Sequence, residues 1–439
     1  MISPLRSRIL GLCCMVFLGG CSSWNLFEKD EVILPGERIP VRKATTDAAT
    51  IAGNIAIALP PATANSEWPQ FNGNATHSIG HVAASATLQQ AWRASVGSGS
   101  SGRIVSPPIV AGGRIYAMDT AATVSAHDAS SGARVWSVDL TPDSENAIDG
   151  FGGGLAAANG RIYVSSGFGA LTALDAANGT EIWTGALRAP SRAAPAIAGG
   201  RVFVVTRENR IFAFDATSGE EGWSKQGFEQ SAGILGGAGP AATGRVVVAP
   251  YSSGEIAAYL AESGRPVWED DLTGIRGSGG LAALNDVAGD PVIVDGVVYA
   301  ASQSGRLAAI GLQDGERIWT RNIGGAQAPY VAGNAVFFVD DSGDLYALDR
   351  QSGDTAWRAS LGAYVDPDDR TGAIVWAGPV AAGGRLLLTS STGRLIAVDP
   401  SNGQIVAEAS LPGGSSVSPI VANGTIYVLT DDATLVAFR

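Results

Sequence analysis

Residue types that carry most enzyme chemistry are scarce in this sequence. The cysteines, Cys13, Cys14 and Cys21, all lie near the N-terminus, so no thiol nucleophile, disulfide or cysteine metal site can form in the rest of the chain. His77 and His81 stand four residues apart, a spacing that places both side chains on one face of a helix. Glycines surround them and no acidic residue accompanies them, so we expect two solvated loop residues rather than a metal site.

Acidic residues and glycine-rich runs offer no stronger catalytic pattern. The densest acidic group, Asp366, Asp368 and Asp369, is typical of one solvated loop, whereas calcium needs several oxygen ligands that converge on one point. The runs Gly150–Gly154 and Gly233–Gly239 lack the Gly-Lys-Ser/Thr ending of a phosphate-binding loop. With three histidines in the chain, a Ser-His-Asp triad would be fortuitous. We therefore predict no catalytic residue, no metal and no cofactor.

The overall composition favours a chain of many short strands. The sequence has 439 residues, of which 46% are hydrophobic, 16% are charged and 58 are glycines. Abundant glycine with ample apolar content is typical of short strands joined by tight turns. The formal net charge is −12. An acidic surface repels the phosphates of nucleic acid, so nucleic acid is not an expected partner.

Residues 1–20 have the pattern of an export signal. Arg6 and Arg8 precede the apolar run Ile9–Leu18, which is too short to span a bilayer comfortably. Two glycines then lead to Cys21, and this ending resembles the lipobox of bacterial lipoproteins. The resemblance implies that residues 1–20 are a lipoprotein signal peptide. It also implies that Cys21 is lipidated and that its acyl chains anchor the protein in a membrane.

The segment after the lipobox separates the anchor from the folded body. By resemblance to Gram-negative lipoproteins, Ser22 in place of Asp implies the periplasmic face of the outer membrane. Prolines and polar residues interrupt residues 21–67, so we predict a flexible tether there and a globular domain over residues 68–439. Alternatively, the short apolar pieces Glu31–Leu34 and Ile51–Leu59 lie against the globule.

One pattern recurs along most of the chain. Each unit has a short first strand, a glycine turn, a strongly apolar strand, an alternating strand and a last strand that carries Trp. A spacing of roughly 45 residues with four short strands per unit is typical of propeller blades. The apolar strand occurs at Arg114–Met118, Arg161–Val164, Arg201–Val205, Arg245–Val248, Val297–Ala300, Val336–Val339, Leu386–Leu388 and Ile426–Leu429.

The last two strands of a unit are joined by an Asp-x-x-x-Gly-x-x-x-Trp motif, as at Asp128, Gly132 and Trp136. Glycine supplies the positive φ of a tight turn, the Asp carboxylate accepts backbone N–H groups, and Trp fills the gap between wedge-shaped neighbours. Ala407 replaces Trp in one unit. The structural tryptophans are Trp92, Trp136, Trp183, Trp223, Trp268, Trp319 and Trp357.

The two ends of the repeat array complement each other. The last unit, Ser418–Arg439, lacks a Trp strand, and the strand Leu88–Val96 carries Trp92 without a blade of its own. Pairing them removes the free sheet edges at which a ring would otherwise open. The sequence therefore predicts an all-β fold: an eight-bladed β-propeller of four-stranded antiparallel blades, closed by an N-terminal strand that completes the last blade.

The repeat resembles quinoprotein-type propellers, and Trp68–Gly73 looks like the segment before their first blade. One branch comprises quinone-dependent dehydrogenases, which hold pyrroloquinoline quinone and calcium and use a Cys-Cys disulfide. Here Cys13 and Cys14 lie in the signal peptide, so this enzyme reading is the alternative and not the preferred interpretation. The other branch is the BamB family of outer-membrane lipoproteins, which the signal peptide, size and blade count favour.

Resemblance to the BamB family implies a non-catalytic scaffold that binds the BamA insertase of the β-barrel assembly complex and, by extension, unfolded outer-membrane proteins. In the family, BamA docks on two loops midway round the ring. A second acidic residue of one loop is replaced here by Ala288, and the other loop has no matching Arg. The residues that the resemblance places at this interface are Ile234, Leu235, Leu284, Asp286 and Val287.

A propeller that binds cell-wall glycan or another envelope protein is a further alternative. Sugar sites often stack aromatic side chains, and Phe151, Tyr251, Tyr330 and Trp376 lie in or near expected loops. We interpret these four aromatics as packing at blade edges.

Overall fold

The computed structural model describes residues 55–97, 104, 106–147, 150–191, 193–228, 237–274 and 285–439. They belong to one compact unit, Thr46–Arg439, and consist of strands and turns with one short 3-10 turn, η1 (Phe71–Gly73). The predicted signal peptide and Cys21 lie outside the described residues.

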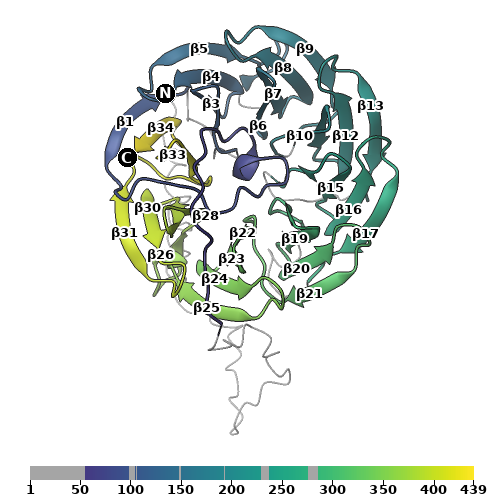
Figure 1. Cartoon of the computed structure of the whole chain (residues 1–439). Coiled ribbons are helices and arrows are strands. Elements are labelled where there is room, and N and C mark those ends of the chain that lie inside the picture. The colour runs from purple at the N-terminus through teal and green to yellow at the C-terminus, as the bar shows by residue number, and fades with distance from the viewer. Residues whose placement is uncertain are drawn as a thin grey trace, which may run out of the picture. The chain divides into compact units, whose positions relative to one another are not determined.

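The strands form eight four-stranded antiparallel sheets, arranged as blades around a ring (Figure 1). In each blade the first strand lies nearest the centre and the fourth forms the rim. Blades 1 to 4, from inner to outer strand, are β2 (Ile109–Ala111), β3 (Arg114–Met118), β4 (Thr123–Asp128) and β5 (Arg134–Asp139); β6 (Gly153–Ala158), β7 (Arg161–Ser166), β8 (Ala170–Asp175) and β9 (Glu181–Ala186); β10 (Ala196–Ala198), β11 (Arg201–Val205), β12 (Arg210–Asp215) and β13 (Glu221–Gln226); and β14 (Ala241–Ala242), β15 (Val246–Pro250), β16 (Glu255–Leu260) and β17 (Pro266–Asp271).

Blades 5 to 8 continue the ring, and a small hairpin precedes blade 7. The hairpin consists of β26 (Tyr364–Asp366) and β27 (Thr371–Ala373). The blades are β18 (Val292–Val294), β19 (Val297–Ser302), β20 (Arg306–Gly311) and β21 (Arg317–Arg321); β22 (Tyr330–Ala332), β23 (Ala335–Val339), β24 (Asp344–Asp349) and β25 (Thr355–Ser360); β28 (Trp376–Ala382), β29 (Arg385–Ser390), β30 (Arg394–Val398) and β31 (Ile405–Ser410); and β32 (Ile420–Ala422), β33 (Thr425–Leu429), β34 (Thr434–Phe438) and β1 (Gln90–Ser95).

The ring is closed by β1, the strand earliest in the sequence. It pairs antiparallel with β34, from Gln90 opposite Phe438 to Ser95 opposite Thr434, and so supplies the outer strand of blade 8. The prediction of eight four-stranded blades closed by the Trp92 strand is confirmed.

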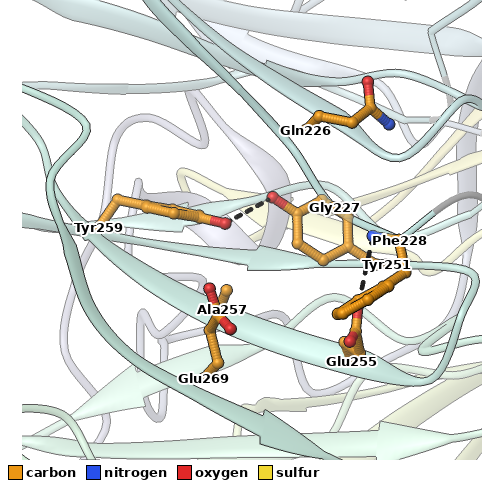
Figure 2. A pocket seen from close by; sticks show the side chains of 8 residues that line it. All are labelled: Gln226, Gly227, Phe228, Tyr251, Glu255, Ala257, Tyr259 and Glu269. Carbon is orange, nitrogen blue, oxygen red and sulfur yellow. Dashed lines mark hydrogen bonds between the residues drawn. The ribbon is translucent and has the colours of Figure 1, made fainter.

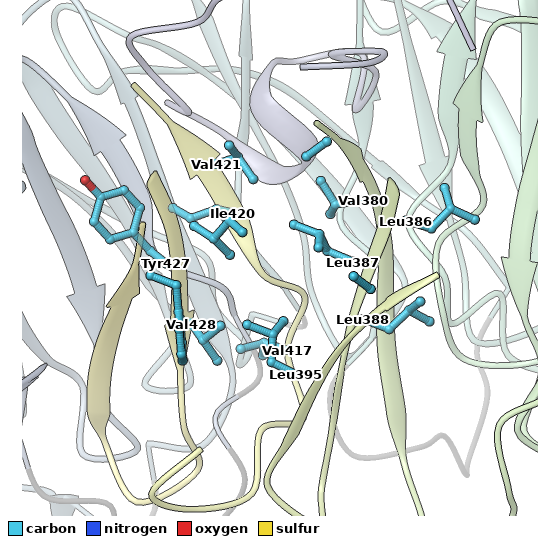
Figure 3. Close-up of a cluster of buried hydrophobic side chains, with 14 of the residues drawn as sticks. Val380, Leu386, Leu387, Leu388, Leu395, Val417, Ile420, Val421, Tyr427 and Val428 are labelled. Atoms are coloured by element: carbon cyan, nitrogen blue, oxygen red, sulfur yellow. The ribbon is translucent and has the colours of Figure 1, made fainter. Parts of the chain in front are cut away.

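The hydrophobic core lies between neighbouring blades, because each sheet is covered on both faces. The middle strands are therefore apolar at consecutive positions, and in β11 Val202, Phe203 and Val204 are all fully buried. Figure 3 shows one cluster where blades 7 and 8 meet, with Leu387 of β29 and Val428 of β33 among its members. The outer strands alternate between exposed and half-buried positions, as expected at a rim that faces solvent.

The complete Asp-x-x-x-Gly-x-x-x-Trp motif occurs in blades 1, 2, 3 and 6 and joins each of them to its neighbours, and blades 4 and 5 keep the Gly and the Trp. Asp128 Oδ1 accepts the backbone N–H groups of Ser130 and Ser131, and Gly132 has φ +75°. A Cβ on Gly132 would lie 2.5 Å from the Trp92 ring, so glycine also makes room for the indole of the preceding blade. Six indoles donate Nε1–H to a carbonyl of the following blade: Trp136, Trp183, Trp223, Trp268, Trp319 and Trp357.

The missing tryptophan at Ala407 follows from the way the ring closes. Ala407 lies in blade 7, and its neighbour around the ring is blade 8. In blade 8 the third and fourth strands, β34 and β1, come from opposite ends of the sequence, so no Asp-x-x-x-Gly turn joins them. An indole at position 407 would have no turn glycine to cover.

The structure differs from the predicted tether at residues 55–67, which lie against the ring. The Ala58 N–H donates to Asn334 Oδ1 at 2.9 Å, and Asn65 Nδ2 donates to the Val421 carbonyl at 2.6 Å. Ile57 and Leu59 pack on the core between blades, which confirms the alternative for this part of Ile51–Leu59. These side chains find apolar partners that the sequence pattern alone does not show. The rest of the predicted tether, residues 21–54, lies outside the described residues.

Candidate functional site

The centre of the ring is crossed by the protein's own chain. This segment, which we call the strap (residues 56–85), runs across the middle of the ring in Figure 1. It forms hydrogen bonds with every blade, always near the end of the innermost strand. From blade 1 to blade 8 the bonded pairs are Trp68 with Val110, Pro69 with Ala157, Gln70 with Ile197, Ala75 with Ala242, Thr76 with Ile293, Gly80 with Tyr330, Val82 with Ala381, and Ser85 with Gly424.

Two buried polar side chains anchor the middle of the strap. Gln70 imitates a neighbouring strand: its Nε2 donates to the Ile197 carbonyl at 3.1 Å and its Oε1 accepts the Ile197 N–H at 2.8 Å. His77 lies with Nδ1 2.8 Å from the Pro291 carbonyl, and its ring meets Phe71 edge-on. Burial lowers the pKa of His77 from 6.5 to about 4, and the hydrogen bond to Pro291 opposes this shift only in part.

The prediction that His77 and His81 are solvated is wrong. They are 3% and 7% exposed, respectively. His81 Nε2 accepts the Gly384 N–H at 2.8 Å, so Nδ1 carries the proton and donates to the Pro60 carbonyl at 2.7 Å. Both histidines hold the strap in place through hydrogen bonds, and they do not lie on a helix.

The residues present do not fit a quinone and calcium centre. Calcium takes six to eight oxygen ligands at one point. Among the described residues, no group of three or more His, Cys, Asp and Glu side chains is arranged to hold a metal ion. The strap also covers the side of the hub on which the turn between the first and second strands of each blade lies. We therefore derive no step through such a cofactor.

Two of the predicted docking residues lie inside the ring. Asp286 and Val287 are 1% and 0% exposed. The Asp286 carbonyl accepts the Gln303 N–H, and the Val287 N–H donates to the Tyr251 carbonyl. These two backbone bonds hold the loop between blades 4 and 5, and both side chains are buried there. The other three, Ile234, Leu235 and Leu284, lie outside the described residues.

The exposed features of the described residues include the rim and the hairpin β26–β27. The predicted surface loop is confirmed, because Asp366, Asp368 and Asp369 are all exposed at this hairpin. On the outer strands, apolar side chains with large exposure include Val135, Ile182, Ile318, Ile405 and Val406. Three of the four aromatics considered for glycan stacking, Tyr251, Tyr330 and Trp376, are buried and pack between blades.

A cavity of about 260 Å³ opens between blades 3 and 4 (Figure 2). Tyr251 and Tyr259 form one wall, and their hydroxyl oxygens are 3.1 Å apart. Burial, followed by the neighbouring Tyr259 and the charges of Glu255 and Glu269, raises the pKa of Tyr251 well above 10. Phe228, which is 66% exposed, lies at the edge. Sequence reasoning noticed Tyr251 but missed the two glutamates, which only a blade-by-blade comparison of charges singles out.

The fold and the Asp-x-x-x-Gly-x-x-x-Trp motif define the chain as a closed propeller of the quinoprotein-like class. The family model described as "Outer membrane protein assembly factor BamB" matches residues 78–144, 120–359 and 353–439. The chain therefore belongs to the BamB family. This confirms the resemblance seen in the repeat.

Individual relatives agree with this assignment. The BamB of Alkalilimnicola ehrlichii is 38% identical over 363 residues, which are 82% of this chain and 90% of the relative. That of Escherichia coli K12 is 29% identical and covers 80% of this chain and 88% of its own. The crystal structure of BamB from Moraxella catarrhalis superposes with a TM-score of 0.68 at 24% identity, over 80% of this chain and all of that one.

The same fold also occurs in enzymes. A europium-containing methanol dehydrogenase superposes with a TM-score of 0.64 at 16% identity, over 83% of this chain and 89% of that one, and this likeness shows the fold alone. In the part of the chain that the structure describes, no helix is long and apolar enough to cross a membrane.

Proposed function

We propose that this protein is a non-catalytic scaffold of the β-barrel assembly machinery, which binds BamA and assists the insertion of outer-membrane β-barrel proteins. Membership of the family of outer-membrane protein assembly factors, over most of the chain, is the observation that carries this proposal. A hub crossed by the strap supports a binding role over catalysis, because the centre of the ring is filled by the protein's own hydrogen-bonded chain.

The scaffold is held to the outer membrane by acyl chains on Cys21 and faces the periplasm. Each buried methylene contributes about 0.8 kcal/mol, so several chains hold the protein firmly. Confinement to the membrane plane raises the effective concentration of partner sites for a ring that presents loops on its faces. Cys21→Ala should move the protein from the membrane fraction to the soluble fraction, and an unchanged distribution would contradict lipid anchoring.

BamA docks on two loops of the ring. One lies between blades 3 and 4, and the other lies between blades 4 and 5. Ile234, Leu235 and Leu284 remain the proposed contacts. Asp286 and Val287 act by holding their loop in place, since both side chains are buried in the described structure. This division of roles predicts that changes at Asp286 weaken binding through the position of the loop.

Affinity purification from detergent-solubilised envelopes tests the function. The tagged full-length protein should retain BamA, and Leu284→Arg should reduce its recovery. Asp366→Asn, on the exposed hairpin that precedes blade 7, is a control at a distant surface and should leave recovery unchanged. Absence of BamA from the wild-type eluate would contradict the proposed function. Equal recovery with Leu284→Arg would remove only that loop from the interface.

A further inference from the structure

One pair of strand positions carries opposite charges in two blades. The first member of the pair is the residue that begins the third strand of the blade. The second member lies on the fourth, outer strand, opposite the third residue of the third strand. In blade 6 these residues are Asp344 and Arg358, and in blade 7 they are Arg394 and Glu408. Both pairs form salt bridges, with Arg394 Nε 2.7 Å from Glu408 Oε1. Each of these blades therefore neutralises the pair within its own sheet.

The arginine of each pair also lies over an aromatic ring. The Arg358 guanidinium is 5.6 Å from the centre of the Tyr346 ring, and that of Arg394 is 5.3 Å from Trp376. A planar guanidinium suits this position because it can bind a carboxylate and stack on a ring at once.

Blade 4 has two acids at the same pair of positions. Glu255 begins β16, and Glu269 lies opposite Ala257. Glu255 Oε2 accepts the Ser253 hydroxyl at 3.1 Å and the Phe228 N–H at 3.4 Å. Among the described residues, neither glutamate forms a salt bridge. Blade 4 thus has two carboxylates at this pair of positions and no cation, and its nearby aromatic rings, Tyr251 and Tyr259, come from other strand positions than Tyr346.

The space for a cation is open in blade 4. Ala257 occupies the position of Phe212 in blade 3, Tyr346 in blade 6 and Ile396 in blade 7. The small side chain leaves the cavity of about 260 Å³ that the two glutamates and the two tyrosines line (Figure 2). The volume is ample for one long side chain, and the mouth opens beside the exposed Phe228.

We propose that this cavity binds an arginine side chain of a partner polypeptide, which supplies from outside the guanidinium that blades 6 and 7 supply from their own strands. Two carboxylates favour a cation, and a guanidinium has several N–H donors in a planar fork with which it can bind carboxylates better than an ammonium can. The proposal rests on the proposed scaffold function only for the class of partner, a polypeptide. Its test contains no BamA, so the two can fail separately.

The probe is the extended pentapeptide acetyl-Gly-Phe-Arg-Phe-Gly-amide. It is titrated into the full-length protein carrying fluorotyrosine, and the fluorine resonances of Tyr251 and Tyr259 are assigned with Phe variants. We expect a saturable shift of these two resonances. The same peptide with citrulline, which keeps the shape of arginine but not its charge, should bind at least tenfold more weakly.

Two variants examine the site from the protein side. Glu269→Arg gives blade 4 the acid and arginine arrangement of blade 6, so it should weaken peptide binding at least tenfold without lowering the melting temperature. Glu269→Gln keeps the size and should weaken binding by a smaller factor. Glu408→Gln in blade 7 is the matched control and should bind as the wild type does. No saturable shift, equal binding of the citrulline peptide, or unchanged binding by Glu269→Arg would each overturn the proposal.

Discussion

The buried histidine of the strap should make the stability of the ring depend on pH. His77 has φ +59°, and its Nδ1 lies 2.8 Å from the Pro291 carbonyl. Asn is the matched replacement, because its side-chain amide can donate from nearly the same place and it tolerates positive φ better than most residues. His77→Asn therefore removes the titrating ring while it keeps the hydrogen bond.

The magnitude follows from the pKa in the two states. The imidazole has a pKa of 6.5 when unfolded and about 4 in the buried site, so the folded protein binds fewer protons between these values. Stability is full above about pH 7.5 and is lost as pH falls toward 4. One pKa unit corresponds to about 1.4 kcal/mol, which gives roughly 3 kcal/mol in total and about 2 kcal/mol between pH 7.5 and pH 5.

Equilibrium urea unfolding at the two pH values measures this loss. The wild type should lose about 2 kcal/mol more than His77→Asn between pH 7.5 and pH 5. Other titrating groups, including His127, whose pKa is also lowered by burial, are present in both proteins and cancel in the difference. An equal loss of stability in both proteins would refute the argument that a neutral His77 holds the strap.

One deletion and three substitutions test the ring and its strap. Deletion of residues 432–439 removes β34, so it should unfold the protein at room temperature in a circular dichroism melt; an unchanged melting temperature would rule out closure by β1. Gly219→Ala and Gly200→Ala share a φ near +75°, but only at Gly219 would the Cβ meet an indole, at 2.5 Å from Trp183. In urea unfolding, Gly200→Ala should cost about 1 kcal/mol and Gly219→Ala clearly more; equal costs would contradict the close approach. Gln70→Leu leaves a buried backbone N–H and carbonyl unpaired and should lower the free energy of unfolding by about 2–3 kcal/mol, with a loss below 0.5 kcal/mol counting against this role.

Periodic local signals made the architecture readable from the sequence. A motif such as Asp128, Gly132 and Trp136 encodes its own turn and the contact to the next blade, and repetition multiplied that signal. The strap has no period, because its hydrogen-bonding partners pass from one blade to another along the segment. Its polar and proline-rich first part, up to residue 67, is therefore typical of a tether in the sequence, although Ala58 and Asn65 form hydrogen bonds with blades 6 and 8.

The candidate site was harder to predict from the sequence, for a different reason. Asp286 was chosen by resemblance to a loop, and its burial depends on packing against blades 4 and 5 that no local pattern specifies. The pair Glu255 and Glu269 becomes conspicuous only when the register of each blade is known, because the two residues are adjacent in space and not in the motif. Blade 4 lacks an arginine at this pair of positions, and this absence is informative only in comparison with blades 6 and 7, which have one.

The seam between β1 and β34 also constrains the order of events during folding. The partner of β1 is β34, which follows all the other strands in the sequence, and the strap forms hydrogen bonds with blades from every part of the chain in between. Contacts of such large sequence separation form slowly, since the whole loop must be closed first. β1 therefore stays unpaired until β34 is available, and the ring closes only when all eight blades are present.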